Sequence, residues 1–246
     1  MKIIMKTIHE RGLSFVKLVS AMAVVVSVVG CSAGNPYVEY ADRNDIISLG
    51  DSVLDSSGEI EAKLEALAGQ TFRNYSRSAA EIAGGVLAPS VVDQYNAANN
   101  TDSDIDTIIM NGGGNDILIP AKLFDPYRCR TRWYRRNISN NCKNLVHDIY
   151  VDAVNLLNTM GNDGVENILY IGYYHPKGGD TNLSKAVDYG NEWLGYGCDN
   201  TTANCDLTPS VNAISESDIL SDDIHPNASG SAKIANLLWP KLQPLL

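Results

Sequence analysis

Four short strand-like runs, each separated from the next by a segment with helical periodicity, constrain the fold of this chain most strongly. They lie at about 45–49, 71–75, 107–110 and 167–172. Short apolar runs of this kind are typical of parallel strands that are buried on both faces. Their alternation with helices predicts an α/β fold in three layers, a mainly parallel sheet with helices on both faces.

Apolar residues spaced three or four apart predict the helices. These are expected at about 59–68, 79–98, 144–160, 182–194 and 228–239. Pro240 is expected to end the last helix, and the segment 120–143 is expected to be irregular. The 246 residues, 44% of them hydrophobic, suit one sizeable domain, which we place at residues 45–246. The formal charge of −10 argues against a nucleic-acid partner.

The N-terminus has the features of an export signal. Four basic residues, ending at Lys17, precede an apolar run from Ala21 to Gly30, which is too short for an ordinary membrane span. The run ends at Val28-Val29-Gly30-Cys31, which resembles the lipobox of bacterial lipoproteins. This resemblance implies a signal peptide at residues 1–30, lipidation of Cys31 and a tether at 31–44. It places the domain in the bacterial cell envelope, on the periplasmic face or at the outer membrane. A plain secretory signal or a signal anchor is the alternative.

The remaining four cysteines are Cys129, Cys142, Cys198 and Cys205. An even number of cysteines in an exported protein indicates disulfides. Four cysteines allow three connectivities, and proximity in the sequence favours pairing the first with the second and the third with the fourth. The CxxC spacing of a zinc site is absent. We therefore predict disulfides, with no metal and no cofactor.

Three segments carry candidate chemistry. Ser52 follows the first predicted strand in Gly50-Asp51-Ser52, at the carboxyl edge where α/β sheets bind ligands. A glycine-rich segment that includes Asn115 follows the third predicted strand. His225 precedes the last helix, and Asp222, three residues earlier, is spaced to hold one nitrogen of its ring. The other nitrogen is then free to act as a base.

These segments together resemble the SGNH, or GDSL-type, hydrolase family. The matching blocks are Gly50-Asp51-Ser52, Gly113-Gly114-Asn115-Asp116 and Asp222-Asp223-Ile224-His225-Pro226-Asn227. Their order, spacing and placement at strand ends or before the last helix carry the resemblance, which covers about residues 45–242. It implies a flavodoxin-like α/β/α sandwich and hydrolysis of carboxylic esters, either lipid acyl or carbohydrate O-acyl, through an acyl-enzyme intermediate.

The resemblance also implies a role for each matched residue. Ser52 is the nucleophile, His225 the base and Asp222 the residue that orients the base. The Asn115 amide and the Ser52 N–H are expected to donate to the oxyanion. The family usually places a glycine at the next oxyanion donor, and the matching position here is Ala79, with Gly84 as the alternative. Asp51 and Asp116 are expected to cap a turn or brace their neighbours.

An arginine-rich and aromatic segment, 128–136, follows the Asn115 block. Gly114, Arg130 and Arg132 are candidate substrate-binding residues, because arginine pairs with phosphate or carboxylate groups. The alternative is a disulfide-bonded surface loop, or one that contacts acidic membrane headgroups.

Two other functions fit parts of the sequence. A metal-dependent phosphoesterase would also use Asp, Asn and His residues, but it needs several metal ligands. Only three histidines follow Cys31, and His147 is expected inside a helix and His175 in a loop. A non-catalytic binding lipoprotein on the same fold is the other alternative. The predicted partners are an ester of a small molecule, glycan or lipid, and a membrane reached through Cys31.

Overall fold

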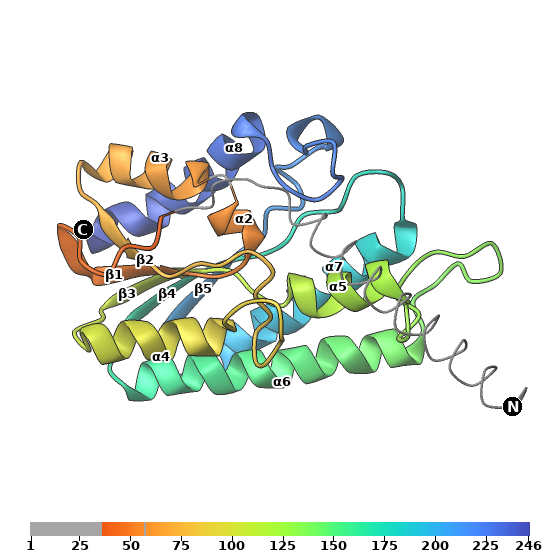
Figure 1. Ribbon diagram of the computed structural model, residues 1–246, viewed down its shortest axis with the longest axis horizontal. Coiled ribbons are helices and arrows are strands. Elements are labelled where there is room, and N and C mark those ends of the chain that lie inside the picture. The colour runs from red at the N-terminus through yellow and green to blue at the C-terminus, as the bar shows by residue number, and fades with distance from the viewer. Residues whose placement is uncertain (1–35, 57) are drawn as a thin grey trace, which may run out of the picture. The chain divides into compact units, whose positions relative to one another are not determined.

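The computed structural model describes residues 36–56 and 58–246 (Figure 1). They belong to a compact unit that spans Gly34–Leu246. The predicted signal peptide, Cys31 and the first part of the predicted tether lie outside the described residues. No helix in the described part of the chain combines the length and apolar character that a membrane span requires.

A five-stranded parallel sheet forms the centre of this unit, which confirms the predicted α/β class. Its strand order, β2-β1-β3-β4-β5, is that of the flavodoxin-like folds. The strands are β1 Arg43–Leu49, β2 Phe72–Asn74, β3 Thr107–Met110, β4 Asn167–Ile171 and β5 Asn204–Thr208.

Seven α-helices are described in this unit. They are α2 Ser52–Asp55, α3 Glu59–Ala68, α4 Val91–Thr101, α5 Gly114–Leu123, α6 Asn140–Asn162, α7 Thr181–Asp199 and α8 Ala228–Leu242. Figure 1 shows α3 and α8 on one face of the sheet and α4 and α6 on the other.

Alternating side chains of each central strand explain these layers. Ile46 and Ile109 belong to the apolar core under α3 and α8, whereas Ile47 and Ile108 belong to the core under α4, α6 and α7. Successive residues of a strand point to opposite faces, so a sheet covered on both sides requires continuous apolar strands. This is why the central strands could be recognised in the sequence.

The helix expected at 79–98 begins only at Val91. Ser90 caps it with a capping box, in which its hydroxyl accepts from the Asp93 N–H at 3.1 Å and its own N–H donates to the Asp93 carboxylate. Gly84 and Gly85 both have positive φ angles, 86° and 89°, and belong to the loop before this cap. The loop between β2 and α4 is therefore longer than the periodicity predicted.

Three other boundaries differ from the sequence-based expectation. The segment 174–213 contains a fifth strand, β5, that the sequence did not reveal. The segment 120–143 contains the end of α5, with Pro120 inside the helix, and the start of α6. The last helix continues two residues past Pro240, because a proline in the final turn removes only one helix hydrogen bond.

The predicted cysteine pairing is confirmed. Cys129 is bonded to Cys142, and Cys198 is bonded to Cys205. The first disulfide closes the loop between α5 and α6. The second joins the end of α7 to β5.

The described end of the predicted tether packs on the domain. Val38 and Asn74 exchange two backbone hydrogen bonds of 2.9 Å. The ring of Tyr37 lies edge-on to that of Tyr75, with centroids 4.9 Å apart. Strand β1 begins at Arg43, so the folded unit starts before the predicted residue 45.

Arg73 on β2 is fully buried, and no carboxylate of the described residues lies within hydrogen-bond distance of it. Its guanidinium instead donates to the carbonyls of Glu39 and Asn44 and to the Tyr75 hydroxyl. It also donates to the carbonyls of Ala98 and Asp102 at the C-terminal end of α4. One buried cation therefore fastens the N-terminal segment, β1 and α4 together.

Candidate active site

The predicted site residues come from three places at the carboxyl edge of the sheet. Ser52 is the first residue of α2, directly after β1, and Asn115 lies in the first turn of α5, after β3. Both line one cavity, together with Gly114 and with Ile224, the neighbour of His225. The fold thus brings together segments that are far apart in the sequence.

His225 and Asp222 form the predicted pair. The His225 Nδ1 lies 2.7 Å from the Asp222 Oδ2, and the other carboxylate oxygen accepts from the backbone N–H groups of Ile224 and His225 at 2.9 Å. Burial acts to raise the pKa of Asp222, but these hydrogen bonds outweigh it and hold the pKa below its ordinary value. Asp222 therefore stays ionised beside the ring.

The other ring nitrogen, His225 Nε2, is buried and has no hydrogen-bond partner among the described residues. Ile224, the residue before His225, lines the same cavity as Ser52. No hydrogen bond joins Ser52 to His225 in the described structure. Catalytic hydrogen bonds are often long before substrate binds.

Asp223, the neighbouring acid, does not bind the His225 ring, which is hydrogen-bonded to Asp222. It has a positive φ of 68°, and its carbonyl accepts from the Lys177 N–H at 3.0 Å. The geometry thus favours Asp222, as the three-residue spacing predicted.

The segment around Ala79 approaches Asn115. The Asn115 Nδ2 donates to the Ala80 carbonyl at 3.0 Å, which leaves its second amide hydrogen available. Ala79 has a φ of 67°, a left-handed conformation that favours glycine. Its N–H and that of Ser52 have no acceptor among the described residues.

Asp55 holds the residue before Ala79. Its carboxylate accepts from both the backbone N–H and the hydroxyl of Ser78. Gly84, the alternative second donor, is exposed, and no heavy atom lies within 4 Å of the position that a Cβ would take there. These contacts favour Ala79 over Gly84 as the donor.

Asp51 caps α2 and braces the site, as expected. Its carboxylate accepts from the Val53 N–H at 2.9 Å, from Asn111 Nδ2 at 2.6 Å and from the Tyr173 hydroxyl. Burial raises the pKa of Asp51, and these three hydrogen bonds oppose the rise. Asn111 and Tyr173 were not predicted as site residues. Asn111 follows β3 directly, as polar site residues often do, but no sequence signal marks Tyr173.

Two glycines in the predicted motifs are required by these neighbours. A Cβ on Gly50, whose φ is 150°, would lie 1.9 Å from Asn111 Oδ1. A Cβ on Gly114 would lie 2.6 Å from the ring of Tyr173. Side chains at either position would displace the groups that hold Asp51.

Asp116 braces the loop before α4. Both of its oxygens lie within hydrogen-bond distance of the Ile82 N–H, at 3.3 and 3.1 Å. Burial raises the pKa of Asp116 to about 7, and the nearby charge of Glu81 adds to the rise.

This pKa predicts a pH-dependent stability. Because the folded pKa exceeds the unfolded one, the folded state binds more protons between about pH 4 and pH 7, and stability falls as pH rises. Asp116→Asn keeps an acceptor for Ile82 but cannot ionise. Relative to this variant, the wild type should lose about 2 kcal/mol of unfolding free energy between about pH 5 and pH 7. Denaturant titrations at both pH values measure this, with exposed Asp104→Asn as the control. A pH-independent difference would contradict the prediction.

The cavity beside Ser52 has a volume of about 100 Å³ and is walled mainly by apolar side chains. These come from α5, α6 and α7, and include Ile117, Leu118, Val146, Ile149, Ala186 and Leu194. Its α7 wall runs from Leu183 to Leu194, which is roughly 16 Å of helix. A single water needs only about 10–15 Å³, so the cavity can hold a chain of several carbon atoms.

Arg130 and Arg132 do not line this cavity. Arg130 pairs with Asp180, with Nε 3.3 Å from the carboxylate, and Arg132 lines a separate hollow. His147 packs against Trp193, and His175 pairs with Asp188 at 2.7 Å. Within residues 36–56 and 58–246, no three His, Cys, Asp or Glu side chains gather as metal ligands would.

The chain matches no family model and no curated protein in sequence. Its structure resembles many solved structures. One is a member of the lipolytic protein G-D-S-L family from Veillonella parvula, at 15% identity and a TM-score of 0.56, covering 80% of this chain and 97% of that one.

Two more neighbours have named activities. The lipase Lip_vut3 from a goat rumen metagenome has 14% identity and a TM-score of 0.60, over 78% of this chain and 94% of its own. Est24, a carbohydrate acetylesterase from Sinorhizobium meliloti, has 13% identity and a TM-score of 0.56, over 82% and 99%. Similarities at this level of identity show a shared fold.

Proposed function

We propose that this chain, whose fold is that of the SGNH/GDSL hydrolases, is a serine esterase that hydrolyses carboxylic esters. The observation that carries the proposal is the Asp222–His225 pair. Its buried, unpartnered Nε2 belongs to the segment that meets Ser52 and Asn115 at one cavity. A histidine that is held at one ring nitrogen by a carboxylate and is free at the other nitrogen can take the proton from a serine hydroxyl.

In the proposed reaction, Ser52 Oγ attacks the acyl carbon while His225 Nε2 takes the hydroxyl proton. The carbonyl oxygen becomes an anion, which the N–H groups of Ser52 and Ala79 and the Asn115 amide stabilise. Collapse of this intermediate breaks the ester bond, and His225 gives its proton to the leaving alcohol. Water then attacks the acyl-enzyme with the same base, releasing the carboxylic acid and restoring Ser52. Asp222 stabilises the imidazolium in both halves.

The cavity supports an acyl group longer than acetyl, and so a lipid acyl ester rather than an O-acetyl sugar. An acetyl group would leave most of the apolar wall without contacts. Each methylene that is removed from water contributes about 0.8 kcal/mol. The apolar side chains of α5, α6 and α7 therefore favour a chain that extends along the roughly 16 Å of α7 wall.

Gly190→Val tests this assignment of the acyl site. Gly190 lines the cavity, and a Cβ there would lie 3.9 Å from Val146, which is an ordinary contact, so the larger side chain takes up cavity space. We expect kcat/KM for an octanoyl ester to fall about 10- to 100-fold while that for an acetyl ester stays unchanged. Gly195→Val, on the same helix but facing Leu207, is the matched control. Equal losses on both esters would contradict the acyl assignment.

One assay separates the proposed esterase from the two alternatives. Residues 34–246 are tested on p-nitrophenyl carboxylic and phosphate esters, with and without a chelator. We expect hydrolysis of the carboxylic ester that the chelator does not change. Phosphate ester hydrolysis that the chelator abolishes would favour a metal-dependent phosphoesterase. No hydrolysis of either ester would favour a binding protein.

The location of the protein is a separate proposal, which rests on the sequence of the N-terminus. The lipobox-like residues 28–31 support a lipoprotein anchored through Cys31 in the bacterial cell envelope. The ester would then be a lipid or other envelope component that reaches the membrane surface.

A further inference from the structure

The loop between α5 and α6 ends in an aromatic hairpin. Arg132 and Arg135 exchange two backbone hydrogen bonds, of 2.8 and 3.3 Å, so that Trp133 and Tyr134 form the tip. Trp133 is 90% exposed and Tyr134 is 66% exposed, with their rings edge-to-face. Turn tips usually carry small or polar residues, and two large exposed aromatics at this position indicate a contact with another surface.

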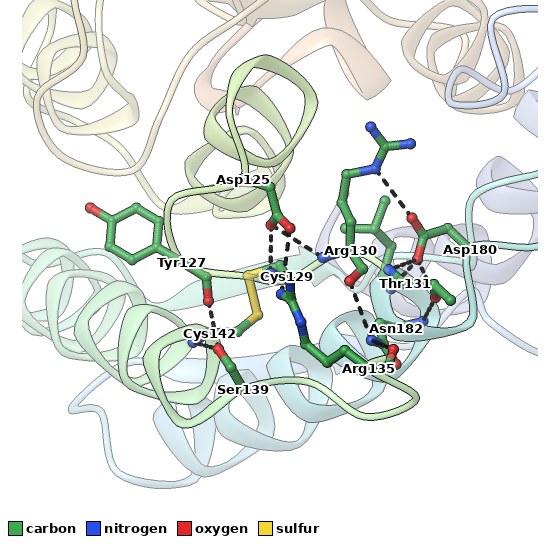
Figure 2. A network of polar contacts seen from close by, with 11 residues as sticks. Asp125, Tyr127, Cys129, Arg130, Thr131, Arg135, Ser139, Cys142, Asp180 and Asn182 are labelled. Atoms are coloured by element: carbon green, nitrogen blue, oxygen red, sulfur yellow. Dashed lines mark hydrogen bonds and ion pairs between the residues drawn. A yellow bond between two sulfur atoms is a disulfide. The ribbon is translucent and has the colours of Figure 1, made fainter. Parts of the chain in front are cut away.

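A disulfide, hydrogen bonds and an ion pair hold the loop that carries this tip, and Figure 2 shows these contacts. The Cys129–Cys142 disulfide joins it to α6. The buried Asp125 carboxylate accepts from the N–H groups of Cys129 at 2.6 Å and Arg130 at 3.2 Å, and it pairs with Arg135 at 3.5 Å.

The start of α7 supplies the other attachment. Asp180 accepts from the backbone and hydroxyl of Thr131 at 2.9 and 2.8 Å, and from the Arg130 guanidinium (Figure 2). The Asn182 amide donates to the carbonyls of Arg130 and Arg135. The exposed tip is therefore a fixed part of the fold.

The charge of this loop is opposite to that of the rest of the chain. Residues 122–136 contain six cationic residues and one acid, whereas the whole chain has a net charge of −10. A hollow of about 350 Å³ beside the tip is lined by arginine and aromatic side chains. These are Arg128, Arg132, Arg135, Phe124, Trp133 and Tyr134, and the one acid in the lining, Asp125, is paired with Arg135.

We propose that this hairpin and hollow are a docking surface for an anionic phospholipid bilayer. Tryptophan and tyrosine favour the boundary between lipid and water, and arginine binds phosphate groups in bidentate fashion. Clustered basic residues bind anionic leaflets electrostatically. A long nucleic acid would meet the acidic remainder of the chain, whereas a flat bilayer touches only the projecting tip.

The loop also adjoins the cavity beside Ser52. The core around its disulfide contains Leu183 and Ala186, with Ile117 packed against it, and all three also line the cavity. Docking at the hairpin would thus hold the cavity close to the lipid surface. The proposal stands independently of the esterase assignment, because it rests only on the loop.

The test is vesicle binding by residues 34–246, the compact unit, which excludes the apolar N-terminus. We expect binding to vesicles that contain phosphatidylglycerol, weak binding to pure phosphatidylcholine, and release by salt. Tryptophan fluorescence should shift to the blue and be quenched by brominated lipid, and both responses should be lost in Trp133→Ser/Tyr134→Ser, which keeps Trp193 and Trp239. Arg128→Gln/Arg132→Gln should lower partitioning roughly 30-fold, and Trp133→Ser/Tyr134→Ser at least about 10-fold.

Matched controls are Lys63→Gln/Lys177→Gln, which makes the same charge change elsewhere, and Tyr40→Ser/Tyr196→Ser, which removes other exposed aromatics. Thermal unfolding checks that each variant is folded. Partitioning that does not depend on lipid charge, or an equal loss in the control variants, would overturn the proposal. So would glycerol phosphate alone producing the full Trp133 response, which would indicate a site for a soluble phosphate.

Discussion

Ser52→Ala is expected to lower kcat/KM for a carboxylic ester by about four to six orders of magnitude. The hydroxyl is the only group at its position that can form the acyl-enzyme. Without it, His225 and the oxyanion donors can assist only direct attack by water. KM should change little, because the substitution removes one atom from a wall that is mainly apolar. Initial rates on a p-nitrophenyl ester measure the effect.

Ser56→Ala is the matched control for this variant, since Ser56 lies one turn further along, at the C-cap of α2. It should retain wild-type activity. A fluorophosphonate should label the wild type at Ser52 and leave Ser52→Ala unlabelled. Activity within about 10-fold of wild type in Ser52→Ala would exclude Ser52 as the nucleophile.

Arg73→Met is expected to lower the free energy of unfolding by about 3–5 kcal/mol. Methionine fills much of the same space but donates no hydrogen bond. The carbonyls of Glu39, Asn44, Ala98 and Asp102 then lose their buried donor. The unfolding midpoint should fall by roughly 10 °C in a domain of this size. Denaturant and thermal unfolding of residues 34–246 measure both quantities.

Arg136→Met is the matched control, because it makes the same substitution at an arginine that is exposed. It should change stability by less than about 0.5 kcal/mol. A loss below about 1 kcal/mol in Arg73→Met would mean that water satisfies these carbonyls after the substitution.

The central strands could be predicted because burial on both faces leaves a continuous apolar run. Strand β5 could not, because it lies at the edge of the sheet and carries Cys205 and Asp206, whose side chains are not fully buried. The start of α4 was misplaced because apolar spacing continued into a segment that Gly84 and Gly85 turn into a loop. The spacing of apolar residues in the sequence therefore predicts a strand or helix only where burial of that segment sets the spacing.

The same distinction holds at the candidate site. Asp222 and His225 are three residues apart and meet within one turn, so their spacing alone predicted their contact. Asn111 and Tyr173 bind Asp51 from the segments that follow β3 and β4, across separations of 60 and 122 residues. Such contacts follow from strand order, which the sequence pattern did not specify.

Helix α7 is fastened at both ends. Near its start, Asp180 and Leu183 connect it to the loop closed by Cys129–Cys142, and near its end Cys198 is bonded to β5. The wall of the cavity between these points cannot recede to admit a larger group without breaking an attachment. For the proposed esterase, the fixed position of α7 would therefore set a sharp upper limit on the length of the acyl chain. The cavity would not widen by induced fit to accept a longer chain. In a reducing environment, where the two disulfides open, the limit on acyl length should become less sharp.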